Sequence, residues 1–176
     1  MRVHLDVCAV RFSAINLDNR VMRKMKAYLL ILMFSLPLFA QANQEERQFT
    51  DIHGNAMAMS DMLGKWVVVN YWASWCPPCL EELPELEHFH HTHKDDLAVV
   101  LGINTEEGMS HSSLADFAED FMLSFPIIPL QQELPHFGAV PGLPTTFLIN
   151  PEGEVVARQV GKVTAEMIEN FIARER

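Results

Sequence analysis

Residues 66–79 read WVVVNYWASWCPPC and contain the features that decide the fold. The first seven are mostly β-branched and aromatic, a composition typical of a buried central strand. Cys76 and Cys79 follow, and in a helix starting at Cys76 their side chains share one face with Cβ atoms about 5–6 Å apart, close to disulfide geometry. The stretch therefore predicts a strand, a short loop and a helix that begins at a pair of redox-active thiols.

The two cysteines are expected to have different roles. Cys76 lies at the predicted helix N-terminus, where free N–H groups and the macrodipole favour a thiolate, so we expect it to be the attacking nucleophile. Cys79, one turn further on, is expected to be the buried resolving thiol. Pro77 and Pro78 suit a first helical turn.

Two alternatives remain open for the cysteine pair, a structural disulfide and half of a zinc site. A bridge across so short a loop restrains little chain entropy. No second CxxC motif and no HxxxH motif completes a zinc site.

A secretory signal precedes this region. Residues 23–26 (RKMK) form a basic n-region and residues 27–40 (AYLLILMFSLPLFA) an apolar h-region. Ala40-Gln41-Ala42 has the pattern of a cleavage site, so we expect a mature protein that begins at Asn43 and is exported, for example to the periplasm. The alternative is an uncleaved membrane anchor over residues 27–40, although this run is shorter than the ~20 residues that span a bilayer.

Residues 1–21 do not belong to the signal pattern, because Met22 stands directly before the n-region. We interpret residues 1–21, which include Cys8, as a mis-assigned N-terminal extension. Residues 22–42 are then the signal peptide, and residues 43–176 form one domain.

Charge and cysteine content limit the possible partners. The full chain has a formal net charge of −10, and residues 43–176 have seven Lys/Arg against 21 Asp/Glu, which gives −14. Such an acidic surface disfavours nucleic acid and anionic lipid. In an oxidising compartment, two cysteines adjacent in sequence favour redox exchange.

Hydrophobic periodicity predicts a single alternating α/β unit. We expect, in chain order, a hairpin over residues 49–59, a capped turn at 60–64, a strand at 66–72, a helix from Cys76 to about His93, a strand at 97–104 and a helix over 110–122. A proline-marked loop then leads to a hairpin of 145–150 with 154–160 and to a final helix over 164–174. The last helix is predicted to turn Met167, Ile168, Phe171 and Ile172 inward.

The chain resembles the TlpA/ResA/DsbE-like group of exported thiol–disulfide oxidoreductases. The resemblance covers residues 48 to 175 and rests on three stretches in order, GKWVVVNYWASWCPPC (64–79), ELPEL (82–86) and GLPTTFLI (142–149). It implies a thioredoxin fold, which is an α/β fold with a mixed central β-sheet flanked by helices on both faces, here with an N-terminal β-hairpin extension. It also implies that no dissociable cofactor is needed beyond the Cys76–Cys79 disulfide.

The resemblance implies further site residues. A cis peptide bond between Leu143 and Pro144 is expected beside the cysteines, with Leu143 backbone groups free to pair with an extended substrate. Thioredoxin has a buried aspartate where this chain has Asn70, and an amide cannot take a proton. Glu82, with a pKa raised by burial, is therefore the candidate base at Cys79. A solvated glutamate on an acidic helix is the alternative.

The surroundings of the thiols complete the prediction. Trp75, Pro77 and Pro78 are expected to contact substrate, whereas Trp72 is expected in the core. The histidines after residue 87 fall on two helix faces, so no metal site is expected; they are His88, His90, His91 and His93.

The predicted function is an exported thiol:disulfide oxidoreductase that acts as a reductant through a mixed disulfide. The resemblance implies a membrane thiol-electron transporter as donor and protein disulfides as clients, with apocytochrome c among the candidates. A monomer is favoured. The alternatives are a disulfide oxidase or isomerase, and a binding module that keeps the fold without turnover. The direction of electron flow depends on the relative stabilities of the dithiol and disulfide states, and small free-energy differences decide it, because 30 mV corresponds to only about 1.4 kcal/mol.

Overall fold

The computed structural model describes residues 48–130, 132 and 134–176. The predicted extension (1–21), signal peptide (22–42) and start at Asn43 lie outside the described residues. In the part of the chain that is described, no helix is long and apolar enough to cross a membrane.

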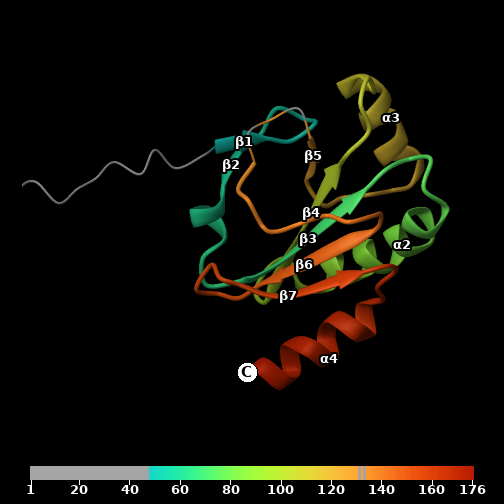
Figure 1. The fold of residues 1–176 in the computed structure, drawn as a ribbon. Helices are drawn as coiled ribbons and strands as arrows, with labels where there is room; N and C mark the ends of the chain where they lie inside the picture. Colours follow the sequence, from blue (N-terminus) through green and yellow to red (C-terminus); the bar gives the residue numbers. More distant parts are fainter. Residues whose placement is uncertain (1–47, 131, 133) are drawn as a thin grey trace, which may run out of the picture. The chain divides into compact units, whose positions relative to one another are not determined.

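A mixed five-stranded sheet forms the centre of the domain, in the order β5-β4-β3-β6-β7 (Figure 1). β4 pairs in parallel with both β3 and β5, whereas β6 is antiparallel to β3 and to β7. The predicted mixed sheet is confirmed. Its strands are β3 (Trp66–Trp72), β4 (Ala98–Asn104), β5 (Ile127–Pro129), β6 (Thr145–Ile149) and β7 (Val155–Val160). Of the helices expected on both faces, the described α-helices bury their apolar residues against one face, and only a short 3-10 helix contributes to the other.

Strand β5 corrects the prediction of a loop in this region. Its three residues are too few to show an alternating pattern, and they are buried on both sides. They become a strand because the chain returns through a helix and lays them in parallel beside Gly102–Asn104 of β4.

Three α-helices bury their apolar residues in one cluster against one face of the sheet. They are α2 (Pro77–His93), α3 (His111–Asp120) and α4 (Ala165–Glu175). Side-chain caps define where two of them start, because Ser110 Oγ accepts from the Ser113 amide and Thr164 Oγ1 accepts from the Met167 amide.

The opposite face of the sheet packs against a second cluster, contributed by β1 (Gln48–Thr50), the 3-10 helix η2 (Met59–Met62) and the chain before β6. β1 and β2 (Ala56–Ala58) form the predicted N-terminal hairpin. Its turn is held by Asp51 Oδ1, which accepts from the amides of His53 and Asn55. Figure 1 shows the hairpin and α4 on opposite sides of the sheet.

Helix α4 contains one wrong prediction. Ile168 and Ile172 are buried as expected and Phe171 is partly buried, but Met167 is 46% exposed. Met167 lies in the first turn of the helix, at the edge of the buried stripe, where the hydrophobic pattern alone does not distinguish the core from its rim.

Candidate active site

Cys76 and Cys79 form a disulfide with their Cα atoms 5.3 Å apart. Cys76 is the N-cap residue of α2, and Pro77 and Pro78 occupy the first two helical positions, where a missing N–H costs nothing. Cys76 is 4% exposed and Cys79 is 0% exposed. Only Cys76 is therefore reachable from solvent, and it is bordered by Trp75, which is 66% exposed.

The peptide bond between Leu143 and Pro144 is cis, as the resemblance implied. Pro144 is buried immediately before β6, and its carbonyl accepts from the Gly161 amide at 2.9 Å. Leu143 is half-buried and packs against the hydrophobic cluster that includes both cysteines. It also borders a largely apolar cavity of about 360 Å³, lined by Tyr71, Thr105, Leu130, Val140, Pro141, Gly142 and Leu143.

Glu82 is fully buried, one turn after Cys79 on α2. Its Oε1 accepts from Asn70 Nδ2 at 2.7 Å, and its Oε2 accepts from the Val163 amide at 2.8 Å. Burial raises the pKa of Glu82 to about 7, and the hydrogen bonds from Val163 and Asn70 oppose this rise. The solvated alternative is therefore wrong for Glu82, although the neighbouring Glu81 is exposed and pairs with Lys162 at 2.8 Å.

Asn70 lets this carboxyl exist in either protonation state. Its Nδ2 also donates to Thr146 Oγ1 at 3.0 Å, whereas its buried Oδ1 has no hydrogen-bond partner in the described part of the chain. Turning the amide over brings Oδ1 to Glu82, where it accepts from the protonated carboxyl. The pair can therefore hold or release a proton inside the core, next to the turn that carries Cys79.

Two of the α2 histidines, His90 and His93, have structural partners, whereas His88 and His91 are exposed. His90 is buried, and its Nδ1 accepts from the Val100 amide at 3.1 Å. Desolvation lowers the pKa of His90 to about 4, so the ring is neutral at physiological pH. His93 Nε2 lies 3.0 Å from Glu169 Oε1 on α4. Within the described residues, no group of three or more potential ligands is arranged to hold a metal ion.

One element of the site was missed from the sequence. The carboxylate of Glu106, which follows β4, accepts from both the amide and the hydroxyl of Ser74 in the loop before Cys76. The two residues are 32 positions apart, and the parallel pairing of β3 with β4 brings them together. No local pattern around either residue indicates this contact.

Comparison with known proteins adds independent information. The model of the AhpC/TSA family matches residues 34–158. The thiol-disulfide oxidoreductase ResA of Geobacillus kaustophilus is 38% identical over 124 residues, which cover 70% of each chain.

Two solved structures show the same fold. StoA from Bacillus subtilis is 28% identical, with a TM-score of 0.61 over 71% of this chain and 94% of that one. A secreted thiol-disulfide isomerase from Corynebacterium glutamicum is 26% identical, with a TM-score of 0.60 over 71% of this chain and 80% of that one.

Proposed function

Because the chain belongs to the AhpC/TSA family and is a thiol–disulfide oxidoreductase of the ResA type, we propose that it acts as an exported reductant of protein disulfides. The observation that carries the proposal is the unequal access to the two sulfurs. A client can reach Cys76 but not Cys79. Thiol–disulfide exchange with a client needs this arrangement, because the client then reacts only with Cys76 and Cys79 resolves the mixed disulfide from inside the protein.

The reaction proceeds in two exchanges. The Cys76 thiolate attacks one sulfur of the client disulfide, which forms a mixed disulfide and releases the first client thiolate. The Cys79 thiolate then attacks the Cys76 sulfur, which releases the second client thiolate and closes the Cys76–Cys79 disulfide. The client gains two electrons and two protons, and the protein pair is oxidised to the state in this structure.

In this proposal Glu82 takes the proton from Cys79 before the second exchange. A carboxyl with a pKa of about 7 is suited to general base catalysis near neutral pH. The client backbone pairs with Leu143 beside cis-Pro144, and its side chains contact Trp75, Pro77 and Pro78, which are exposed around Cys76.

The cellular setting is part of the proposal. Residues 22–42 direct export, and a membrane thiol-electron transporter re-reduces the pair. Clients are oxidised exported proteins, with apocytochrome c as one candidate, and the protein acts as a monomer. The signal-like sequence supports export, and so does the likeness to a protein described as secreted.

The reduction potential of the purified protein tests the direction of electron flow. Equilibration with thiol–disulfide buffers, followed by the fluorescence of Trp72 and Trp75, is expected to give a value near the approximately −270 mV of thioredoxin. A value near the approximately −120 mV of DsbA would make the protein an oxidant and overturn the proposal.

An isomerase is the second candidate, because one of the similar structures is described as an isomerase. Incubation with a scrambled disulfide protein separates the two functions. A reductant yields free thiols in proportion to the electrons supplied, whereas an isomerase restores native pairing with only catalytic amounts of thiol.

Trapping tests the roles of the cysteines. We expect Cys79→Ser to accumulate a mixed disulfide with a client, visible on a non-reducing gel, and Cys76→Ser to form none. The opposite pattern would contradict the assignment of Cys76 as nucleophile.

The mass of the exported product tests the start at Asn43, because a membrane-bound product that retains residues 27–40 would instead indicate an anchor.

A further inference from the structure

The loop that carries Cys76 is held from one side by the segment that follows β4. The carbonyl of Trp72, at the end of β3, accepts from Thr105 N at 2.9 Å and from Thr105 Oγ1 at 3.2 Å. Two residues later, Ser74 donates to Glu106 Oε2 from its amide at 3.2 Å and from its hydroxyl at 2.6 Å. Glu106 is itself oriented, because its amide donates to Asn104 Oδ1 at 3.1 Å.

We propose that Glu106 is a positioning residue for thiol exchange, which fixes the loop before Cys76 through Ser74 and whose negative charge disfavours the Cys76 thiolate. The second effect stabilises the disulfide relative to the dithiol and so makes the reduced pair a stronger reductant. The inference deepens the proposed function and rests on it for its biological meaning.

The positioning effect follows from the short hydroxyl contact. A hydrogen bond from a hydroxyl to a carboxylate at 2.6 Å is charge-assisted and is stronger than one between neutral groups. The same carboxylate satisfies the Ser74 amide, which belongs to a turn closed by the bond from Cys76 N to the Ala73 carbonyl at 3.2 Å. Without a partner at Glu106, this half-buried amide lacks an acceptor and the turn is less restrained.

The electrostatic effect follows from proximity. Two residues span at most about 7 Å from Ser74 to Cys76, so the Glu106 carboxylate lies within about 10 Å of the Cys76 amide. A unit charge at about 10 Å, which is the order of separation that this sets for the Cys76 sulfur, shifts a pKa by about 0.3 unit in a water-like medium and by about 1.2 units at an effective dielectric constant of ~20. The charge acts against the N-terminus of α2, which favours the thiolate.

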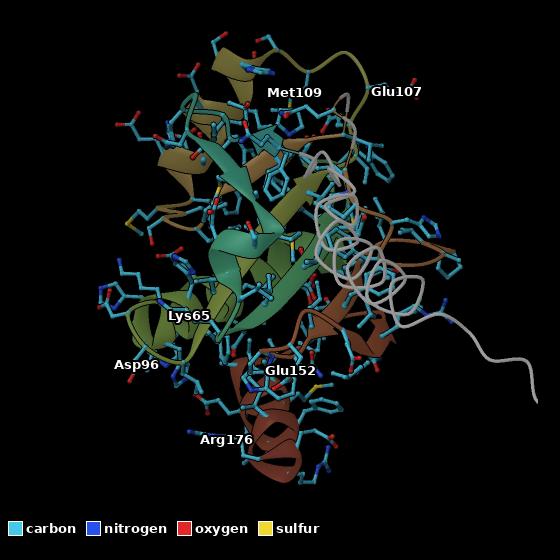
Figure 2. All side chains as sticks on the ribbon, turned by 90° about the vertical axis from the view of Figure 1, so that its left-hand side faces the viewer. Lys65, Asp96, Glu107, Met109, Glu152 and Arg176 are labelled. Carbon is cyan, nitrogen blue, oxygen red and sulfur yellow. A yellow bond between two sulfur atoms is a disulfide. The ribbon has the colours of Figure 1, made fainter. Side chains whose placement is uncertain are left out.

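Other charges near the thiols differ from Glu106 in their contacts. Glu82 is buried behind Cys79, and Glu81 is paired with Lys162. Glu107 carries the same charge one residue further on, but it is exposed and makes no hydrogen bond to the Cys76 loop among the described residues. Figure 2 shows Glu107 at the periphery, on the connection from β4 to α3. Glu107→Gln is therefore a matched control for Glu106→Gln.

The test is the pH dependence of Cys76 alkylation in the reduced, purified protein, with the labelled residue identified by mass spectrometry. Glu106→Gln keeps an acceptor for Ser74 and removes the charge. We expect it to lower the Cys76 pKa by about 0.3 to 1.2 units and to make the reduction potential less negative. Glu107→Gln is expected to shift the pKa less, because the exposed Glu107 carboxylate makes no hydrogen bond to the Cys76 loop among the described residues.

Glu106→Ala removes both the charge and the acceptor. We expect the same pKa shift as in Glu106→Gln, together with a several-fold lower rate of client disulfide reduction at high pH, where Cys76 is fully ionised. If Glu106→Gln moves the pKa no more than Glu107→Gln, or raises it, the electrostatic role is refuted. Equal high-pH rates for Glu106→Ala and the wild type would refute the positioning role.

These outcomes are separable from the proposed function. Alkylation needs neither a client nor an electron donor, so the pKa comparison is decided even if the wild-type potential proves to be oxidising. Conversely, a reducing wild-type potential with no effect of Glu106→Gln would leave the proposed function in place and remove this inference.

Discussion

Replacing Glu82 by glutamine removes the buried ionisable group at the centre of the site. The pKa of Glu82 is raised from 4.5 to about 7, so in this window the folded protein binds a proton that the unfolded chain has released. The free energy of unfolding therefore falls as the pH rises from 4.5 through 7. At about 1.36 kcal/mol per unit, a shift of about 2.5 units costs the wild type about 3 kcal/mol in all.

The contribution of His90 to the free energy of unfolding changes with pH in the opposite direction, so the wild type alone does not reveal the effect of Glu82. Its pKa is lowered from 6.5 to about 4, so the stability that its neutral ring provides is lost as the pH falls from 6.5 through 4. This effect is also about 3 kcal/mol. The two slopes nearly cancel in the wild type, whereas Glu82→Gln is expected to show stability that rises with pH.

The assay is urea unfolding of the oxidised protein at pH 5, 6, 7 and 8, followed by tryptophan fluorescence. Glutamine can donate to Asn70 Oδ1 after the amide turns over and can accept from the Val163 amide, so it mimics the protonated carboxyl. The stability of Glu82→Gln relative to the wild type is expected to increase by about 2.5 kcal/mol between pH 5 and 8. If the difference in free energy of unfolding between Glu82→Gln and the wild type does not change with pH, the raised pKa of Glu82 is refuted. Glu81→Gln, at an exposed position on the same helix, serves as the control.

The other predictions concern stability and use the same assay. His90→Asn keeps an acceptor for the Val100 amide, and with the assay extended to pH 4 its stability relative to the wild type is expected to increase by about 3 kcal/mol as the pH falls from 6.5 to 4; a difference between the two proteins that does not change with pH would contradict the assignment. Gly102→Ala places a Cβ 2.7 Å from Phe125 Cε2 and is expected to destabilise the protein by about 1–3 kcal/mol, and an unchanged midpoint would contradict this. Ser110→Ala removes the N-cap of α3 and is expected to cost about 1 kcal/mol, whereas Ser112→Ala, in the same exposed turn, should cost less.

The sequence by itself determined the parts of the protein that depend on short-range patterns. The β-branched run of β3, the cysteines at the start of α2 and the β1–β2 hairpin are each specified by neighbouring residues, through side-chain shape, helix-terminal chemistry and turn-forming residues. The expected order of strands and helices followed from these patterns. The cis bond before Pro144 followed from the family resemblance, because proline alone does not determine its isomer.

Only the tertiary structure decided the features that depend on pairing between distant segments. β5 is a strand because β4 is beside it, and the pKa of Glu82 is near neutrality because folding buries its carboxyl, an effect that the hydrogen bonds from Asn70 and Val163 only partly oppose. Glu106 reaches Ser74 because two parallel strands end at the same edge of the sheet. Burial and long-range hydrogen bonds arise only when the chain has folded, so the sequence shows which residues can react, and packing decides their access, proton affinity and support.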